Sequence, residues 1–276
     1  MTVSIIIRSK NESQYIGQVL EAIYAQTYKD FEVLLIDSGS TDNTIKIAKT
    51  FPVKVYEILP EEFTYGFATN YGFSRSAGEI VVCLSAHAIP ASEKWLENMM
   101  SNFRDSMCAA VMGKDLPMPE CNPFDRRGMS KLYDVPRAEI NDCHFDFGAT
   151  NAAIRKSVWE EMPFDENLSY AEDNDWGGKV KAKGYRIFFD PAATVYHSHN
   201  DTYKQLINRF YNEAYALRVL GRQSYNFPRI ALDFLAGSAY DMTYVLMKRY
   251  NLKWFFYAPI RRFCMNIGRL KANKRN

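Results

Sequence analysis

Three of the four histidines in this 276-residue chain stand where apolar, strand-like runs end. His87 follows the run 80–84, and His197 and His199 are two residues apart, so that in a strand they project from one face. Imidazole binds manganese, zinc and iron well, but magnesium and calcium poorly. We therefore expect His87, His197 and His199 to hold a divalent cation, with Mn²⁺ as the expected ion and Mg²⁺ as the alternative. The competing interpretation is that one of the pair simply packs in its strand.

Acidic residues cluster directly before an apolar helical pattern, at Glu172, Asp173 and Asp175. A carboxylate within hydrogen-bond reach can take a proton from an attacking hydroxyl group. An acid in the first turn of a helix can also do no more than offset the positive end of the helix dipole. The second interpretation explains Asp175 more readily than Asp173, which leaves Asp173 as the candidate general base.

The elements that must position these side chains alternate between apolar strands and amphipathic helices. The pattern predicts strands at 3–7, 31–36, 53–59 and 80–84, and helices at 16–24, from 41 or 42, at 67–77 and from 156. Strands that are apolar on both faces and separated by helices indicate a sheet covered on both sides. An α/β fold is therefore expected for the first two hundred residues.

Polar residues follow three of the predicted strands, at 8–12, 37–42 and 85–87. In such sheets ligands bind beyond the carboxyl ends of the strands, so these segments should converge on one crevice. The segment 37–42 is also typical of a turn followed by a helix N-cap. Taken with its neighbours, Asp37 is interpreted as a fixed acceptor for a base or a ribose.

Five sequence motifs occur in a specific order: SIIIRSKNE at 4–12, LIDSGSTDNT at 35–44, GEIVV at 78–82, AEDNDW at 171–176 and VYHSH at 195–199. Together they resemble family 2 glycosyltransferases of the GT-A fold, most closely the bacterial rhamnosyltransferase-like members of surface polysaccharide synthesis. The resemblance covers residues 1 to about 200. It implies a GT-A domain, a Rossmann-like central mixed sheet flanked by helices, over 1–200, and a C-terminal helical extension over 201–276.

The resemblance also implies roles for individual residues. Asp173 would be the catalytic base, which implies direct attack with inversion at the anomeric carbon. The expected nucleotide-sugar-binding residues are Arg8, Asn11, Glu12, Asp37, Ser38, Asn70, Arg75, Ser85, Asn151 and Glu172. Among them Asn70 and Arg75 would lie near the diphosphate, and the region of Asn151 would face the acceptor or the sugar.

The chain departs from the family pattern where an Asp-x-Asp is expected. Ser85 replaces the first carboxylate and His87 the last, and Thr69 stands where an arginine is common. A cation must offset the charge that builds on a departing diphosphate. The imidazoles can supply a metal for this task, or Lys114 or the pair 126–127 can supply the charge without one.

Charge is distributed unevenly, although the formal net charge is only +2. Residues 248–276 hold nine basic residues and no acid, which leaves 25 basic and 32 acidic residues elsewhere, a net charge of −7. After Pro259 the residues Ile260, Phe263, Ile267 and Leu270 form one stripe, with arginines on the remaining surface. A basic amphipathic helix of this kind predicts peripheral contact with anionic lipid, or else a partner helix. The acidic remainder of the chain disfavours a nucleic-acid partner.

Two further segments bear on organisation. Residues 113–123 are rich in proline and are predicted to form a long surface loop. Five scattered cysteines and the lack of a basic leader favour a cytoplasmic location, with contact at the inner face of the plasma membrane.

We expect an inverting transferase that moves a hexose such as rhamnose from a nucleoside-diphosphate sugar to a glycan or a lipid-linked oligosaccharide. A nucleotidyltransferase is the first alternative, but it would need a glycine-rich loop after the first strand, and 9–13 contains no glycine. A non-catalytic scaffold subunit that binds a glycan or a nucleotide sugar is the second, because the Asp-x-Asp is missing.

Overall fold

The computed structural model describes residues 1–219, 221 and 225–273, and it divides into two compact units. Unit 1 comprises residues 1–118 and 129–198, and unit 2 comprises residues 119–128 and 199–276. The predicted domain border at residue 200 stays a prediction.

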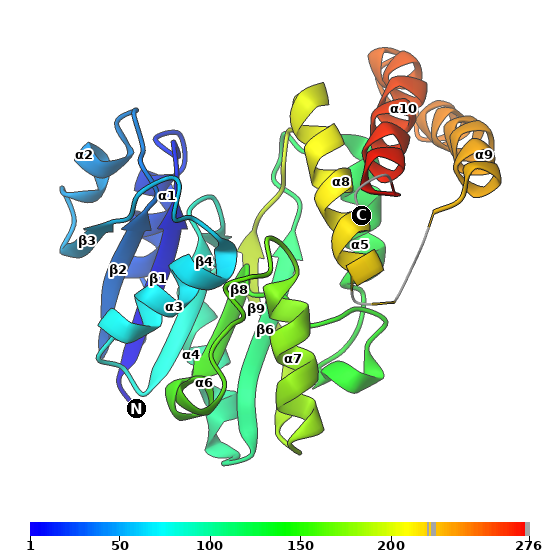
Figure 1. Cartoon of the computed structure of the whole chain (residues 1–276). Coiled ribbons are helices and arrows are strands. Elements are labelled where there is room, and N and C mark those ends of the chain that lie inside the picture. The colour runs from blue at the N-terminus through cyan, green and yellow to red at the C-terminus, as the bar shows by residue number, and fades with distance from the viewer. Residues whose placement is uncertain (220, 222–224, 274–276) are drawn as a thin grey trace. The chain divides into compact units, whose positions relative to one another are not determined.

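Unit 1 is built on a mixed sheet (Figure 1). Its strands within the described residues are β1 (Val3–Ser9), β2 (Phe31–Asp37), β3 (Val53–Glu57), β4 (Ile80–Ser85), β5 (Ile89–Pro90), β6 (Cys108–Leu116), β7 (Ala138–Glu139), β8 (Asn151–Arg155) and β9 (Arg186–Tyr196). The order across the sheet is β3-β2-β1-β4-β8-β6-β9-β5, and β7 pairs with β9. Strands β3, β2, β1 and β4 run parallel, whereas β8 is antiparallel to β4 and to β6.

Helices cover both faces of this sheet because alternate strand side chains point to opposite sides. Ile5 and Ile7 pack in a core with α1 (Ile16–Tyr24), α2 (Thr44–Ala48) and α4 (Trp95–Ser101). Ile6, between them, packs in a second core with α3 (Tyr65–Arg75), α6 (Lys156–Glu161) and α7 (Glu172–Ala182). Each such isoleucine is fully buried and contributes about 1.5–3 kcal/mol of transfer free energy.

The expected α/β fold with a central mixed sheet is confirmed, and the predicted strands fall within two residues of the observed ones. The prediction of a long loop over 113–123 is wrong at both ends. Residues 113–116 complete β6, which pairs in parallel with β9 and changes register between Gly113 and Lys114. Pro123 begins α5 (Pro123–Leu132). Pro117 and Pro119 lie in the short connection between these two elements.

Unit 2 is helical. It contains the first part of α5, together with α8 (Tyr203–Val219), α9 (Phe227–Met247) and α10 (Lys253–Asn273). None of the helices in the described part of the chain combines the length and the apolar character required to cross a bilayer.

The prediction that the arginines of the C-terminal helix lie on its outer surface is wrong. Pro259 lies inside α10 and does not begin it. Arg261 is buried and pairs with Asp125, and Arg262 Nε donates to Asp241 Oδ2 at 2.7 Å, whereas Phe263 is exposed. The arginines therefore face the inside of unit 2 and part of the apolar stripe faces outward. Lys274 and Arg275, two of the nine basic residues, lie outside the described residues.

Candidate active site

The carboxyl ends of β2, β1 and β4 lie side by side, as the polar segments after the strands predicted. In the register of the sheet Ser9 lies opposite Asp37, and Arg8 lies opposite Ser85. The three loops that follow these strands therefore begin at one edge of the sheet.

Backbone and side-chain hydrogen bonds join the loops after β1 and β2. Asn11 has a left-handed backbone with a φ of 57°, its N–H donates to Ser40 Oγ at 2.8 Å, and its Oδ1 accepts from the N–H of Thr41 at 2.8 Å. The N–H of Glu12 donates to Thr44 Oγ1 at 2.7 Å. These bonds fix the place from which the Glu12 side chain extends.

Asp37 lies at this edge, but it is not the open acceptor that we expected. Its Oδ1 accepts from the N–H groups of Gly39 and Ser40, and its Oδ2 accepts from the hydroxyls of Ser9 and Ser40. The side chain is fully buried, and Ser38 beside it is buried too. Asp37 therefore shapes the turn, as the competing interpretation held.

His87 and His197 face each other across this edge. Their Nε2 atoms are 3.1 Å apart, and their rings are stacked with centroids 4.9 Å apart. His87 Nδ1 lies 2.9 Å from Glu12 Oε1, and His197 Nδ1 lies 3.1 Å from Asp115 Oδ2. In each ring Nδ1 therefore lies beside a carboxylate, and Nε2 lies beside the Nε2 of the other ring.

This arrangement fits a divalent cation. A carboxylate accepts hydrogen bonds, so each Nδ1 carries a proton and the two Nε2 lone pairs would face each other unless a proton or a cation lies between them. Two nitrogens that bind one ion at about 2.1 Å lie about 3.0–3.4 Å apart, which matches the observed separation. Carboxylates that orient metal-binding histidines in this way are usual in metal sites.

His199 completes the group that the sequence predicted. Suitable nitrogen atoms of His87, His197 and His199 all lie within 4.8 Å of one another. Ser85, the other member of the altered motif, has its Oγ 3.3 Å from His87 Nδ1 and so contributes to the anchoring of that ring.

Asp115 is a member of this site that the sequence analysis missed. It lies in β6 opposite Val195 of β9, and the following pair brings Leu116 beside the strand end that carries His197. The false prediction of a loop over 113–123 hid this strand register. A strand assignment would have placed Asp115 next to the histidine strand.

Arg8 of β1 and Glu172 of α7 form an ion pair that is largely shielded from solvent. Arg8 Nη1 lies 3.6 Å from Glu172 Oε1 and donates to Thr69 Oγ1 at 3.0 Å. Burial, and then the negative charge of Asp173, raise the pKa of Glu172 to about 7, while Arg8 opposes the increase. Glu172 therefore holds its proton more tightly than an ordinary glutamate.

Asp173 lies in the first turn of α7. This helix begins directly after Ala171, which has a left-handed backbone with a φ of 62°. Its Oδ2 accepts from the N–H of Ala149 at 3.0 Å, and its Oδ1 accepts from the N–H of Asn174 at 2.8 Å. These two bonds aim the carboxylate at the loop before β8.

Charged groups of β1 and α7 influence a buried thiol in β4. Burial raises the pKa of the Cys83 thiol in β4 to about 12, and Arg8, Glu172 and Asp173 all act on that thiol electrostatically. Strand register and hydrogen bonds place two of these groups near the end of β4. Arg8 lies opposite Ser85, and Asp173 binds the N–H of Ala149, next to Thr150, whose carbonyl accepts from the N–H of Ser85.

Asn151 lies at this edge, opposite Leu84 of β4, but its side chain is taken up by internal hydrogen bonds, whereas Arg75 and Asn70 point elsewhere. Asn151 is buried, where its Oδ1 accepts from Trp95 Nε1 at 3.0 Å and its Nδ2 donates to the carbonyl of Ala193 at 3.1 Å, so it joins β8 to its neighbours. Arg75 lies at the far end of α3, with its guanidinium 5.0 Å from the centre of the Tyr71 ring.

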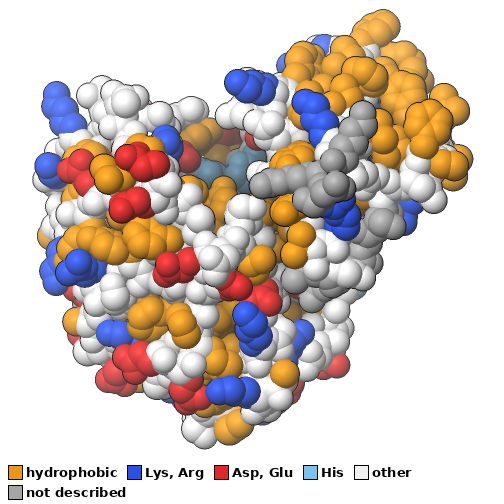
Figure 2. Space-filling view, viewed as in Figure 1, with side chains coloured by type: hydrophobic (Ala, Val, Ile, Leu, Met, Phe, Trp, Pro, Cys, Tyr) orange, Lys and Arg blue, Asp and Glu red, His pale blue; other side chains and the backbone are white. Residues whose placement is uncertain are grey.

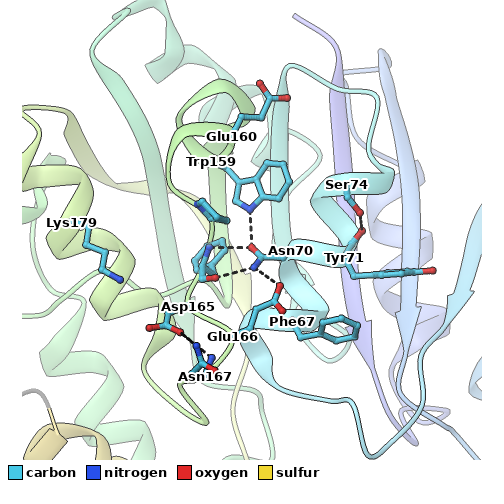
Figure 3. Close-up of a pocket in the computed structure, with 12 residues that line it drawn as sticks. Phe67, Asn70, Tyr71, Ser74, Trp159, Glu160, Asp165, Glu166, Asn167 and Lys179 are labelled. Carbon is cyan, nitrogen blue, oxygen red and sulfur yellow. Dashed lines mark hydrogen bonds between the residues drawn. The ribbon is translucent and has the colours of Figure 1, made fainter.

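Asn70 points into a separate pocket of about 940 Å³ between α3 and the segment 159–167 (Figure 3). Its Oδ1 accepts from Trp159 Nε1 at 2.8 Å, and its Nδ2 donates to the carbonyl of Phe164 at 2.9 Å and to Glu166 Oε1 at 2.8 Å. Through these hydrogen bonds Asn70 connects α3 to that segment.

The two arginines of the metal-free alternative have partners inside unit 2. Arg127 pairs with Asp241 inside unit 2, and Arg126 donates to the carbonyl of Pro119 at 2.9 Å in the same unit. Lys114 is half-buried in β6.

Parts of this sequence match a known protein family and curated proteins. The family model of glycosyl transferase family 2 matches residues 4–162. The chain is 29% identical to the O-antigen chain rhamnosyltransferase RfbN of Salmonella typhimurium over 223 residues, which cover 77% of this chain and 71% of that protein. It is 32% identical to the O-antigen chain rhamnosyltransferase WbaN of Salmonella anatum over 203 residues, which cover 69% and 64%.

A solved structure shares the fold over almost the whole chain. The mannosyltransferase PcManGT of Pyrobaculum calidifontis, in complex with GDP-Man and Mn²⁺, superposes with a TM-score of 0.63 at 22% identity and covers 98% of this chain and 85% of its own. The order of motifs, the mixed sheet and the family match agree, and the chain belongs to glycosyl transferase family 2.

Proposed function

We propose that this glycosyltransferase moves a hexose, in the first place rhamnose, from a nucleoside-diphosphate sugar to a glycan or a lipid-linked oligosaccharide, with inversion. The similarity to two O-antigen rhamnosyltransferases supports the sugar and the surface-polysaccharide setting. The observation that carries the proposal is the arrangement at the end of β4. Arg8 lies opposite Ser85, Asp173 binds the N–H of Ala149 next to Thr150, whose carbonyl accepts from the N–H of Ser85, and the anchored imidazole of His87 follows two residues later.

The chemistry needs a base and a positive charge at this place. In the proposed step the acceptor oxygen forms a bond to C1 of the sugar, and the bond from C1 to the diphosphate oxygen breaks, with its electron pair remaining on the diphosphate. Asp173 takes the proton of the acceptor hydroxyl group, and the Arg8 guanidinium offsets part of the charge that develops on the leaving group. Direct displacement by the acceptor inverts the configuration at C1.

His87 and His197, with His199 beside them, would hold a divalent ion, for which Mn²⁺ is the proposed species because the donors are imidazoles. When bound, the ion supplies positive charge against the diphosphate. Glu12 and Asp115 would keep the two rings in the orientation that binds it. Asn11 and the main chain of the loop after β1 would border the nucleotide.

The proposed acceptor also bears on where in the cell the enzyme acts. A lipid-linked oligosaccharide is held at a membrane surface, so we propose action at the cytoplasmic face of the plasma membrane, with the segment 248–276 toward the lipid. The exposed side chains of Lys248, Arg249 and Lys253 support this placement.

The proposed base is tested by Asp173→Asn. The variant should bind donor normally but should lose about 10²–10⁴-fold in kcat, because the amide cannot take the proton. Asp175→Asn is the matched control, since Asp175 lies in the same helical turn and pairs with Lys179 at 2.6 Å. It should retain transfer within a few-fold. Full transfer by Asp173→Asn would refute the assigned role.

The proposed metal site is tested by Mn²⁺ titration calorimetry. Wild type should bind one ion, and His87→Ala and His197→Ala should each abolish that binding. His144→Ala is the control, because His144 is the remaining histidine and is exposed. Unchanged Mn²⁺ affinity in His87→Ala would show that His87 does not hold the ion.

A further inference from the structure

The helical unit has an unusual distribution of polarity: cations lie inside and large apolar side chains lie outside. Arg261 is 7% exposed and pairs with Asp125, and Asp241 is fully buried between Arg127 and Arg262. The surface of α9 and α10 carries leucine, methionine and phenylalanine instead, and Figure 2 shows apolar side chains gathered at the upper right of the molecule, where these helices lie.

These exposed residues form a continuous surface, which we call the α9–α10 face. Along α9 the exposed residues Leu232, Leu235, Ala239 and Leu246 follow the spacing of one helix side, and Met242 between them is partly buried. A shallow apolar groove of about 440 Å³ runs between them and Phe255 and Pro259 of α10. Leu235 is 67% exposed and Phe256 is 68% exposed, so the face is open along both helices.

A soluble surface rarely leaves this much connected apolar area in contact with water. Scattered apolar residues would need no explanation, but here one helix side and its neighbour form a single strip. An exposed apolar strip of this kind is typical of a surface that binds a protein or a membrane.

Cations stand at the end of the face. Lys248, Arg249 and Lys253 are exposed in and beside the turn that joins α9 to α10, next to the exposed side chains of Met247 and Leu252. Lys253 Nζ lies 4.8 Å from the centre of the Trp254 ring. Basic residues beside aromatic and apolar ones are typical of segments that lie in the interface of an anionic bilayer.

The same charges argue against a second copy of this chain. Residues 199–276 contain 14 lysines and arginines but only 4 aspartates and glutamates, a net charge of +10. Pairing two such faces would bring like charges together, whereas an anionic lipid surface complements them.

We propose that the α9–α10 face inserts into the headgroup region of an anionic membrane, with Leu235, Leu246 and Phe256 as apolar anchors and Lys248, Arg249 and Lys253 as headgroup contacts. Arg261 and Arg262 form ion pairs with Asp125 and Asp241 on the buried side of helices α9 and α10. The opposite, apolar side of these helices therefore faces outward. This proposal deepens the membrane contact of the proposed function, but it does not depend on the sugar or on the reaction.

The test is co-sedimentation of the full chain with vesicles of phosphatidylglycerol and phosphatidylethanolamine, in the absence of donor and acceptor. Wild type should pellet with these vesicles, and its partition coefficient should fall at least 10-fold on pure phosphatidylcholine vesicles. Leu235→Glu and Leu246→Glu should each lower the partition coefficient on anionic vesicles at least 10-fold. Leu59→Glu is the control, because Leu59 is 56% exposed but belongs to unit 1, and it should pellet like wild type.

Three results would overturn the proposal. Wild type could remain in the supernatant, Leu235→Glu could pellet as well as wild type, or light scattering could show a dimer that Leu235→Glu dissociates, which would assign the face to protein pairing. Circular dichroism of Leu235→Glu should match wild type, because the side chain is exposed. Its donor hydrolysis without vesicles should be unchanged, so a failure of membrane binding is distinguished from a failure of the transferase proposal.

Discussion

Asp115 acts on the proposed metal through His197, which makes it a positioning residue. Asp115→Asn keeps the shape of the side chain but weakens the acceptor for His197 Nδ1. We expect Mn²⁺ affinity to fall about 10–100-fold, with turnover recovered at saturating Mn²⁺. Calorimetry and the Mn²⁺ dependence of the rate measure this, with the exposed Asp142→Asn as control. A loss of turnover that excess Mn²⁺ does not restore would contradict a positioning role.

Glu172 gives a pH dependence of stability whose sign can be worked out. Its pKa is raised from 4.5 to about 7 in the folded chain, mainly by burial, so the folded state binds more protons than the unfolded state between these values. The stabilisation is full below about pH 4.5 and is lost as the pH rises through 7. Glu172→Gln should therefore flatten the melting temperature between pH 5 and 8, measured by thermal unfolding. An unchanged slope would contradict the raised pKa.

Residue types in the sequence were enough to predict the histidine group but not the use of each polar side chain. His87, His197 and His199 come together because strand ends of one sheet meet at one edge. Asn151, Asn70 and the Asp37 carboxylate are instead taken up by internal hydrogen bonds. Those bonds depend on which backbone groups face the side chain, and residue type alone does not specify them.

At the scale of elements, the packing of α7 decides where Asp173 lies. A Cβ on Gly177 would stand 2.9 Å from the Cβ of the buried Phe147, whereas a Cβ on Gly178 would meet no atom within 4 Å. Gly177→Ala should therefore destabilise the protein by about 1–3 kcal/mol and displace α7, with a lower transfer rate.

Gly178→Ala is the control on the same helix and should be neutral or stabilising by up to about 1 kcal/mol, because alanine favours the helix. Urea unfolding of both variants measures the difference. Equal stability of the two variants would contradict the close packing of α7 on Phe147.

The elements also show where periodicity misleads. In α10 the arginines were expected on the outer surface of a basic amphipathic helix, but Arg261 is buried against Asp125. Asp125 lies more than a hundred residues away in the sequence, so its pairing with Arg261 requires the tertiary structure. Strands β1, β2 and β4 were predictable because each is a short run that is mainly apolar on both faces.

At the scale of the whole molecule, ligand binding should appear as thermal stabilisation. A ligand that binds only the native state at 100 times its Kd adds about 2.7 kcal/mol to the free energy of unfolding. We expect nucleoside diphosphates to raise the melting temperature of wild type further when Mn²⁺ is present, and His87→Ala to lose that Mn²⁺-dependent increment. A scan of GDP, UDP and dTDP with and without Mn²⁺ measures it. An equal increment in His87→Ala would contradict a metal at the imidazole pair.

Catalysis by the assembled site is tested most directly by the release of nucleoside diphosphate from a panel of sugar nucleotides, with wild-type protein and with or without Mn²⁺. At least one donor should turn over, the rate should rise with Mn²⁺, and Asp173→Asn should reduce it by at least about 10²-fold. Binding of a donor without turnover under any metal condition would contradict catalysis and would favour a non-catalytic nucleotide-sugar-binding subunit.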